Sequence, residues 1–178
     1  ARMHKINLIL PIAMLGLTVA PALAETWTID GKHSQANFKV RHMMVSNVNG
    51  TISGIKGAAE YDGKNIAGLK VNADMDINTI STNEAGRDKH LRGADFFDTE
   101  KFPNMSFKSK RVVKGSKGKF KLIGDLTMHG VTKEVALAVE GPTPVIKDSK
   151  GQERFGASAT AGVVATGGDV TGRAAGNG

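Results

Sequence analysis

The sequence predicts an all-β fold, arranged as an antiparallel barrel or sandwich. Two observations lead to this prediction. Apolar and polar residues alternate with a period of two along several segments, and turn-forming residues separate these segments at short intervals. The chain of 178 residues also contains 22 Gly and no Cys, and its length suits one domain with a single core.

Alternation is clear in five segments, each of which presents one apolar face. In one of them, Phe38 and Val40 share a face that Lys39 does not. Three further segments alternate more weakly, so that about eight strands are expected. The clear strands are 26–30, 35–42, 69–77, 119–128 and 134–140, and the weaker ones are 48–61, 104–113 and 154–160.

Residues 83–95 interrupt the alternation, and their charged sequence predicts one short helix that ends near Gly93. Phe96 and Phe97 follow this segment directly. Neighbouring side chains of a regular strand point to opposite faces, so both rings cannot enter the same core. We expect the pair to lie across a cavity mouth or to plug the end of the barrel.

Residues 1–24 have the three-part layout of a secretory signal peptide. A basic start that includes Lys5 precedes an almost wholly apolar run over 6–20, and a small-x-small cleavage sequence ends at Ala24. An apolar run of about 15 residues is shorter than a bilayer span requires. We expect cleavage after Ala24 and export. Because the exported chain has no Cys for disulfides, a bacterial periplasm fits best.

Several classes of catalytic site lack support. Without Cys, the chain has no thiolate metal site and no cysteine nucleophile. It has no nucleophile elbow, phosphate loop or dinucleotide motif, and Asp95 with Asp98 does not by itself define a hydrolytic site. The histidines of the exported part lack the spacing of zinc motifs but could converge with Asp88 or Asp95, so a metal-dependent periplasmic enzyme remains an alternative. These histidines are His33, His42, His90 and His129.

The formal net charge is +7, and many basic residues surround one predicted hairpin. The simplest interpretation is a solvated face whose lysines keep the sheet edge from pairing with other chains. The alternative is transient contact with an anionic membrane surface. Nucleic acid is not expected as a partner of an exported chain without an aromatic platform. The hairpin residues are Lys108, Lys110, Arg111, Lys114, Lys117, Lys119 and Lys121.

A barrel of eight strands is either filled by its own side chains or just wide enough for one small ligand. A cavity here would be lined with Phe, Val, Leu, Ile and Met, which suits a long apolar chain. Burial of one five-carbon isoprene unit provides about 3–4 kcal/mol, so about three or four units exceed the roughly 8 kcal/mol of micromolar binding. Periodicity leaves a packed structural or stress-response barrel as a further alternative.

Three blocks of residues resemble the YceI-like family of bacterial periplasmic proteins, which are described as polyisoprenoid-binding. The blocks follow one another in the family's order and cover about 25–160. Their motifs are Trp27-x-Ile29-Asp30-x-x-His33-Ser34 with Phe38-x-Val40-x-His42, then Ile80-x-Thr82, Arg87-Asp88-x-His90-Leu91, Asp95-Phe96-Phe97-Asp98 and Phe102-Pro103, and finally Gly124-x-Leu126-Thr127-x-His129-Gly130-Val131-Thr132.

The resemblance implies an extended, lipocalin-like antiparallel barrel with no established catalytic activity and no metal. Its interior would hold a polyisoprenoid, an isoprenoid quinone or a similar amphiphile, as carrier or store. Apolar motif residues are then candidates for the wall or mouth of the site, and polar ones for headgroup contacts or structural hydrogen bonds. The apolar candidates are Phe38, Val40, Ile80, Leu91, Phe96, Phe97, Phe102, Leu126 and Met128, and the polar candidates are His42, Asp88, His90 and His129.

The chain departs from the family after Thr160, where an Arg-bearing strand with Asp-Phe-Gly and then a closing strand would follow. Residues 161–178 are instead rich in Gly and Ala and contain no aromatic residue, which is typical of a flexible tail. A shifted or truncated reading frame and genuine divergence would both explain it. We expect a signal peptide at 1–24, a barrel domain at 25–160 and a tail at 161–178, with an open seam that permits oligomers.

Overall fold

The structure, a computed structural model, describes residues 24–42, 46–166 and 169–173. Within these ranges there are one α-helix, α1 (Ala85–Arg92), and two single-turn 3₁₀ helices, η1 (Ile66–Gly68) and η2 (Ile77–Thr79). The strands are β1 (Glu25–Thr28), β2 (Ala36–His42), β3 (Ser46–Ile52), β4 (Ile55–Tyr61), β5 (Lys70–Asp76), β6 (Asn104–Lys114), β7 (Lys119–Met128), β8 (Val131–Glu140), β9 (Ile146–Lys147), β10 (Glu153–Arg154), β11 (Ser158–Thr160), β12 (Gly162–Thr166) and β13 (Asp169–Arg173).

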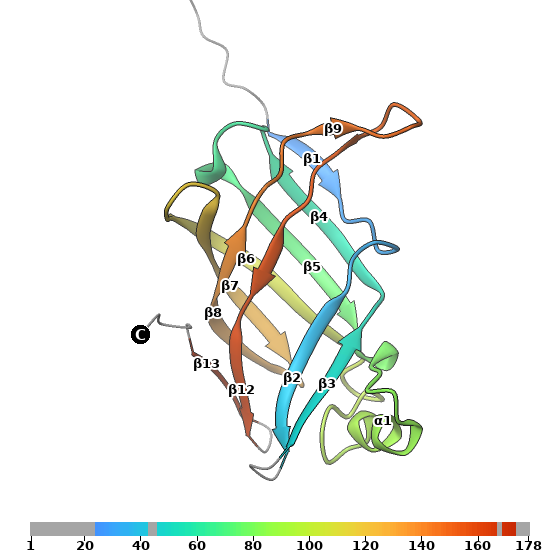
Figure 1. Cartoon of the computed structure of the whole chain (residues 1–178). Coiled ribbons are helices and arrows are strands. Elements are labelled where there is room, and N and C mark those ends of the chain that lie inside the picture. Colours follow the sequence, from blue (N-terminus) through green and yellow to red (C-terminus); the bar gives the residue numbers. More distant parts are fainter. Residues whose placement is uncertain (1–23, 43–45, 167–168, 174–178) are drawn as a thin grey trace, which may run out of the picture.

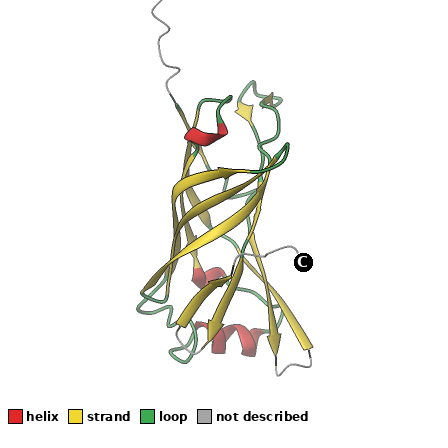
Figure 2. Cartoon of the chain, turned by 90° about the vertical axis from the view of Figure 1, so that its left-hand side faces the viewer, coloured by secondary structure: helices red, strands yellow, loops and turns green. Residues whose placement is uncertain are grey.

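Seven strands form one antiparallel sheet in the order β1-β4-β5-β6-β7-β8-β11. The sheet curls into a half-barrel, which Figures 1 and 2 show from two directions. Among the described residues, no ladder of hydrogen bonds joins β1 to β11, so these two strands are the edges of an open sheet. The prediction of an all-β antiparallel fold is confirmed, with the sheet left unclosed.

Side chains bridge the seam, by which we mean the junction between the edge strands β1 and β11. The rings of Trp27 in β1 and Phe155, just before β11, meet edge to face with centroids 4.8 Å apart. Tyr61 adds a second edge contact to Phe155 at 5.8 Å. Near them, Arg154 Nη1 donates to Asp30 Oδ2 at 2.9 Å. The seam is therefore held by side-chain contacts in place of a backbone ladder.

One glycine lets two long strands approach closely where the sheet bends. Gly124 of β7 is buried, and a Cβ at this position would lie 2.5 Å from the carbonyl oxygen of Lys108 and 2.6 Å from Cζ of Phe107. The register of β6 against β7 shifts between Ser109 and Arg111, opposite this point. Such a bulge increases the local twist of a strand pair. The glycine and the bulge together favour the curl of the sheet.

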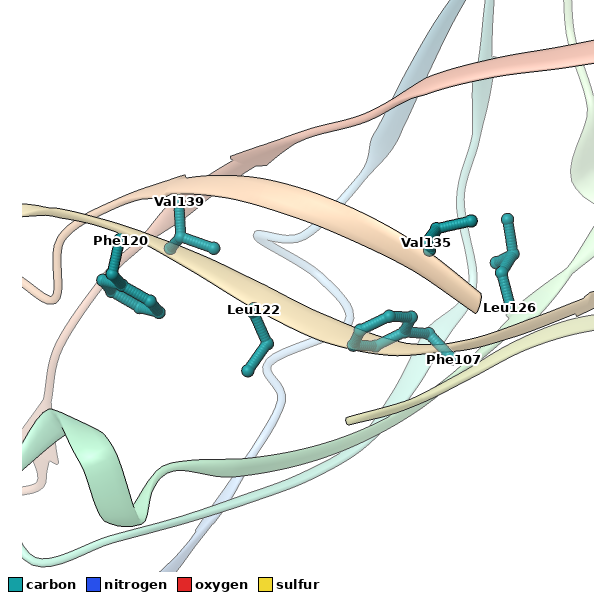
Figure 3. Packing of buried hydrophobic residues seen from close by; sticks show 6 residues of the cluster. All are labelled: Phe107, Phe120, Leu122, Leu126, Val135 and Val139. Carbon is teal, nitrogen blue, oxygen red and sulfur yellow. The ribbon is translucent and has the colours of Figure 1, made fainter. Parts of the chain in front are cut away.

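The strand cluster, as we call it, is the larger part of the core and lies on β6, β7 and β8 (Figure 3). Ladder partners bring its members together, since Phe107 lies opposite Leu126 and Phe120 lies opposite Val139. Residues directly opposite each other on neighbouring strands share a face. The cluster consists of Phe107, Phe120, Leu122, Leu126, Val135 and Val139.

The hairpin β2–β3 forms a sheet of its own and joins the rest of the molecule near α1. Thr51 and Ser81 exchange backbone hydrogen bonds of 2.8 and 2.9 Å. Next to this contact lies a second buried group, Ile52, Ile77 and Ile80, which we call the end cluster. Ile77 is only 1% exposed. The end cluster and α1 therefore close one end of the half-barrel (Figure 1).

The predicted helix is confirmed, and local hydrogen bonds explain both of its ends. The carboxylate of Glu84 accepts from the N–H groups of Gly86 and Arg87 at 2.9 and 2.6 Å, which caps the first turn of α1. At the other end, the N–H of Gly93 donates to the carbonyl of His90 at 3.0 Å. The charged segment thus forms a helix over 85–92, inside the predicted range of 83–95.

After Thr160 the described part of the chain forms two strands that do not join the barrel sheet, and the domain boundary at Thr160 stays a prediction. β12 and β13 pair in an antiparallel sheet of their own, with Gly162 opposite Arg173 and Thr166 opposite Asp169. The Gly and Ala content concealed β-branched residues such as Val163 and Val164, which favour strands. The predicted strand 154–160 is also divided, since β10 pairs with β9 and β11 pairs with β8.

Candidate functional site: the inner face of the half-barrel

The concave side of the sheet carries a largely apolar surface, which we call the inner face. Its members are defined by the register, in which Ala59 lies opposite Val71, Ala73 opposite Phe107, and so on across the sheet. The face runs along the full length of β7, which spans about 30 Å. Its apolar residues include Ala59, Val71, Ala73, Met75, Met105, Phe107, Phe120, Leu122, Leu126, Met128, Val135, Leu137 and Val139.

Two predicted wall residues lie on this inner face. Leu126 belongs to the strand cluster, and Met128 ends β7 near the closed end of the half-barrel. Both side chains are buried. Their positions on alternate residues of one strand follow from the period of two that the sequence displays.

Four other apolar candidates gather at the end cluster. Ile80 is a member of it, and Phe38, Leu91 and Phe97 pack against it from β2, from α1 and from the segment after α1. The ring of Phe38 covers Gly50, where a Cβ would lie 2.2 Å from the ring. These side chains form a packed closure of the barrel end, which is one of the two arrangements expected for the pair of phenylalanines.

Phe96, the other member of that pair, points away from the core. Its side chain is 48% exposed, and its ring meets the ring of His90 edge to face with centroids 4.8 Å apart. His90 is also exposed, and its Nε2 lies 3.9 Å from a carboxylate oxygen of Asp95. The structure therefore places both predicted contact residues on the outside of the closed end.

Asp88, a predicted headgroup contact, has a clear structural role. Its Oδ1 accepts from the backbone N–H of Thr82 at 2.8 Å and from the hydroxyl of the same residue at 2.6 Å. These hydrogen bonds, the hydroxyl bond first, hold the pKa of Asp88 below its usual range. Arg87 Nε donates to the Thr82 hydroxyl at 2.7 Å. The network ties α1 to the chain that precedes it, and a headgroup contact by Asp88 stays a prediction.

His129 and Phe102 meet at the turn between β7 and β8, with ring centroids 4.8 Å apart. The two turn residues, His129 and Gly130, have φ values of +51° and +72°, as a tight two-residue hairpin turn requires. The Nε2 atom of His129 is buried and has no hydrogen-bond partner among the described residues. A buried polar atom without a partner is unfavourable, so His129 is a source of strain in the fold.

Two candidates are not settled by the structure. Val40 and His42 belong to β2, where they lie opposite Val48 and Ser46. Their side chains fall outside the described part of the chain, so their role as wall and headgroup contacts stays a prediction.

The remaining histidines are held apart on different elements. His33 follows β1, where its Nδ1 is 2.8 Å from Asp30 Oδ2, whereas His90 is on α1 and His129 follows β7. Across the described ranges, no group of three His, Cys, Asp or Glu side chains is placed to hold a metal ion. No helix within these ranges has both the length and the apolar character needed to cross a membrane.

A family profile described as the YceI-like domain matches residues 27–168. The chain belongs to the YceI-like family. A UPF0312 protein of Vibrio parahaemolyticus is 42% identical over 132 residues, which make up 70% of this chain and 70% of the relative. A UPF0312 protein of Yersinia pestis is 39% identical over 136 residues, or 75% of this chain and 70% of the relative.

Solved structures agree with this assignment to the YceI-like family. The crystal structure of the Campylobacter jejuni YceI protein matches with a TM-score of 0.60 and 32% identity, over 78% of this chain and 80% of that one. BcnA of Burkholderia cenocepacia matches with a TM-score of 0.55 over 65% of this chain and 70% of its own. At 18% identity, BcnA shows the likeness of the fold alone. The resemblance inferred from the motifs is confirmed.

Much of the inner face in this YceI-like chain lies outside the family motifs and was not predicted as a site. Phe107, Phe120 and Leu122 are buried there, although none of them belongs to a motif block. The signal was present, because the alternation over 119–128 already placed Phe120 and Leu122 on the same face as Leu126.

Lys133 is a further inner-face residue that the family motifs do not include. The register of β8 against β7 places it opposite Leu126, on the inner face, and it is half-buried. Extending the apolar alternation of Val135, Leu137 and Val139 back by two residues leads directly to Lys133. A cation at an inward position of an otherwise apolar strand face was therefore readable from the sequence.

The basic residues around the β6–β7 hairpin fall into two groups. On the outer face of the sheet they pair with carboxylates, since Lys110 Nζ lies 2.6 Å from Asp125 Oδ1 and 3.3 Å from Glu134 Oε2. The hydrogen bond to Asp125, followed by that to Glu134, raises the pKa of Lys110. Exposed pairs of this kind add little stability, and they fit a solvated face. Lysines near the turn have fewer carboxylate contacts, and contact with an anionic membrane stays a prediction.

Proposed function

We propose that this YceI-like protein binds a long apolar lipid, a polyisoprenoid or an isoprenoid-quinone-like amphiphile, along its inner face and acts as a carrier or store. One observation carries the proposal: the inner face is apolar along the whole of β7, and it belongs to an open half-barrel. The resemblance to a family described as polyisoprenoid-binding supports the same ligand class.

The seam offers a route by which such a lipid enters. The edge strands are joined by the rings of Trp27 and Phe155 and by the ion pair of Asp30 and Arg154, in place of a continuous ladder. Exposed ion pairs contribute little free energy, and aromatic contacts of this type contribute about 0.5–1.5 kcal/mol beyond their buried area. Parting these contacts requires less free energy than separating a ladder of backbone hydrogen bonds. The half-barrel can then widen around a chain without unfolding.

The energetic requirement is modest. Each buried CH₂ group contributes about 0.8 kcal/mol, so about three or four isoprene units provide more than micromolar binding needs, even after ordering costs. A ligand that displaces inner-face side chains also loses the contacts that these side chains make with one another. The number of displaced residues therefore sets how much of this binding free energy remains. The specific rival is a packed barrel without ligand, which the tight burial of the strand cluster favours.

Matched substitutions on the two faces of the sheet test the proposal. Val135 is buried on the inner face and Val113 is exposed on β6. Replacing each by Thr exchanges a methyl group for a hydroxyl at nearly constant volume. We expect Val135→Thr to weaken farnesol binding several-fold in a calorimetric titration and Val113→Thr to leave it unchanged. Circular dichroism shows that each variant is folded, and Val135→Ala replaces Val135→Thr if the buried hydroxyl prevents folding.

Either of two results would refute binding at the inner face. Farnesol could fail to bind the folded wild type, which would favour the packed barrel. Alternatively, the two valine variants could lose affinity equally, which would place the ligand elsewhere on the molecule.

Export belongs to the same proposal. We infer from the apolar run over 6–20 and the small-x-small sequence that ends at Ala24 that residues 1–24 direct the chain to the periplasm and are removed there. The intact mass of protein from osmotic-shock fluid of the natural host tests this. A chain that begins at Glu25 is the expected result, and recovery in the cytoplasmic fraction with residues 1–24 retained would contradict it.

A carrier role sets this proposal apart from the metal-dependent alternative. A carrier releases its ligand chemically unchanged, whereas an enzyme alters it. Recovery of farnesol in unmodified form after prolonged incubation with the protein and added Zn²⁺ is expected. A product that depends on Zn²⁺ and is lost in His90→Ala or His129→Ala would favour the enzyme.

A further inference from the structure

A cleft of about 300 Å³ is lined by the segment before η1 and by the turn between β6 and β7. Figure 1 shows these segments at the end of the half-barrel opposite α1. The segment that leads into η1 forms one wall, the turn between β6 and β7 forms another, and Gly141 and Pro142 complete it. We call this the lysine cleft, because four of its lining residues are Lys64, Lys114, Lys117 and Lys119.

The positive charge of the lysine cleft is only partly balanced by the protein. None of its lining residues is acidic. Lys119 is paired, with its Nζ 2.8 Å from an oxygen of Glu140. Within the part of the chain that the structure describes, no carboxylate forms an ion pair with Lys64, Lys114 or Lys117. Cations gathered at one concave site repel each other and attract an anion.

The turn that carries these lysines is fixed by its backbone. The N–H of Lys119 donates to the carbonyl of Ser116 at 2.8 Å, and the N–H of Gly115 donates to the carbonyl of Lys119 at 3.2 Å. Gly118 has a φ of +73°, which a residue with a side chain rarely adopts. The N–H of Gly141 ties the turn to the next strand connection through the carbonyl of Gly118 at 2.9 Å. The lysines thus project from an ordered frame.

The floor of the lysine cleft is apolar and continuous with the inner face. Phe120 lines the cleft and is also a member of the strand cluster. Ile66 lines the cleft and packs against the same cluster. Figure 3 shows Phe120 and Val139 at one end of this cluster. A single molecule can therefore contact the lysines with one end and the inner face with the other.

We propose that the lysine cleft binds the anionic head group, a phosphate or a carboxylate, of an amphiphile whose chain begins at Phe120 and Ile66 and continues along the inner face. This proposal rests on the proposed lipid-binding function and adds the chemistry of the head group and its position. The unpaired lysines supply the charge, and Phe120 supplies the first apolar contact. A neutral lipid would gain only the second of these two interactions.

The test compares three probes, namely farnesyl diphosphate, farnesol and inorganic diphosphate, by isothermal titration calorimetry at low ionic strength. The variant is Lys64→Gln with Lys117→Gln. Its control is Lys108→Gln with Lys121→Gln, which removes the same charge from exposed residues outside the cleft. We expect farnesyl diphosphate to bind most tightly and the cleft variant to weaken it about 30-fold. The control variant should lose only a few-fold in affinity for farnesyl diphosphate. The affinity for farnesol should be unchanged in both variants.

The outcomes separate failure of this proposal from failure of the proposed function. If farnesol binds but farnesyl diphosphate binds no tighter, or if both double variants weaken it equally, the head-group site is refuted and lipid binding stands. If inorganic diphosphate binds as tightly as farnesyl diphosphate, the cleft holds free anions and the amphiphile is refuted. If neither farnesyl compound binds, both proposals fail.

Discussion

Adding one methyl group at Gly124 tests how the half-barrel is built. In Gly124→Ala, the new Cβ would lie 2.5 Å from the carbonyl oxygen of Lys108 and 2.6 Å from Cζ of Phe107. The carbonyl belongs to the backbone of β6 and cannot rotate away, so β6 and β7 must separate locally. Overpacking of this kind costs about 1–3 kcal/mol. For a domain of this size, that corresponds to a fall in Tm of about 3–10 °C.

Urea unfolding followed by circular dichroism measures this loss. Gly68→Ala is the matched control, because a Cβ at Gly68 meets nothing within 4 Å, and its free energy of unfolding should stay within about 0.5 kcal/mol of the wild type. Combining Gly124→Ala with Phe107→Leu removes the ring contact and should show coupling between the two sites. If Gly124→Ala unfolds at the wild-type urea concentration with the same slope, β6 and β7 do not approach as described.

Three further predictions concern the seam, the helix and the turn after β7. Hydrogen bonds from His33, then from the backbone N–H of Lys32, and from Arg154 lower the pKa of Asp30 from 3.8 to about 2. The ionised carboxylate of Asp30 therefore stabilises the fold fully above pH 3.8, and this contribution is lost as the pH falls towards 2. In a series of urea midpoints measured against pH, Asp30→Asn should flatten the curve between these two values. Asp88→Ala should speed hydrogen exchange in α1, because the backbone N–H and the hydroxyl of Thr82 both lose their acceptor, whereas Asp95→Ala at an exposed site should not. His129→Asn should raise the free energy of unfolding by about 1 kcal/mol, since it removes a buried unpartnered nitrogen and Asn suits this turn; a loss of stability would show that Nε2 has a partner in solution.

The fold was largely readable from the sequence, because alternation with a period of two reports which face each residue occupies. β7 occupies 119–128, the range that the alternation of Phe120, Leu122 and Leu126 predicts. Residues 83–95 interrupt the alternation and are charged, so they have no apolar face that would join a sheet. This interruption predicts the position of α1. Closure was less readable, because it depends on contacts such as Arg154 with Asp30, which are 124 residues apart.

The C-terminal strands show where composition misleads. The Gly and Ala content of residues 161–178 is typical of a tail, yet residues 162–166 pair with 169–173. Backbone hydrogen bonds do not require large side chains, and Val163 and Val164 were sufficient reason to expect a strand. In this segment the local pattern of β-branched residues is a better guide to structure than the local Gly and Ala content.

The candidate site was only partly readable, for two physical reasons. Family motifs include residues that stabilise the fold, and they do not separate these from residues that face a ligand. Asp88 is a motif residue that stabilises the fold, since its carboxylate accepts two hydrogen bonds from Thr82. The second reason is that residues far apart in the sequence meet only in the folded chain. Lys64 and Lys117 line one cleft, whereas the sequence by itself indicates only a basic hairpin.

Native mass spectrometry of the protein purified without detergent from its natural host tests the central claim most directly. We expect a mass above that of the chain by several hundred daltons. The excess should pass into organic solvent as a lipid with an isoprenoid tail. Denatured mass of the same sample identifies the chain itself. A folded protein that carries no extractable lipid and that also fails to take up added farnesol would rule out lipid binding at the inner face and favour the packed barrel.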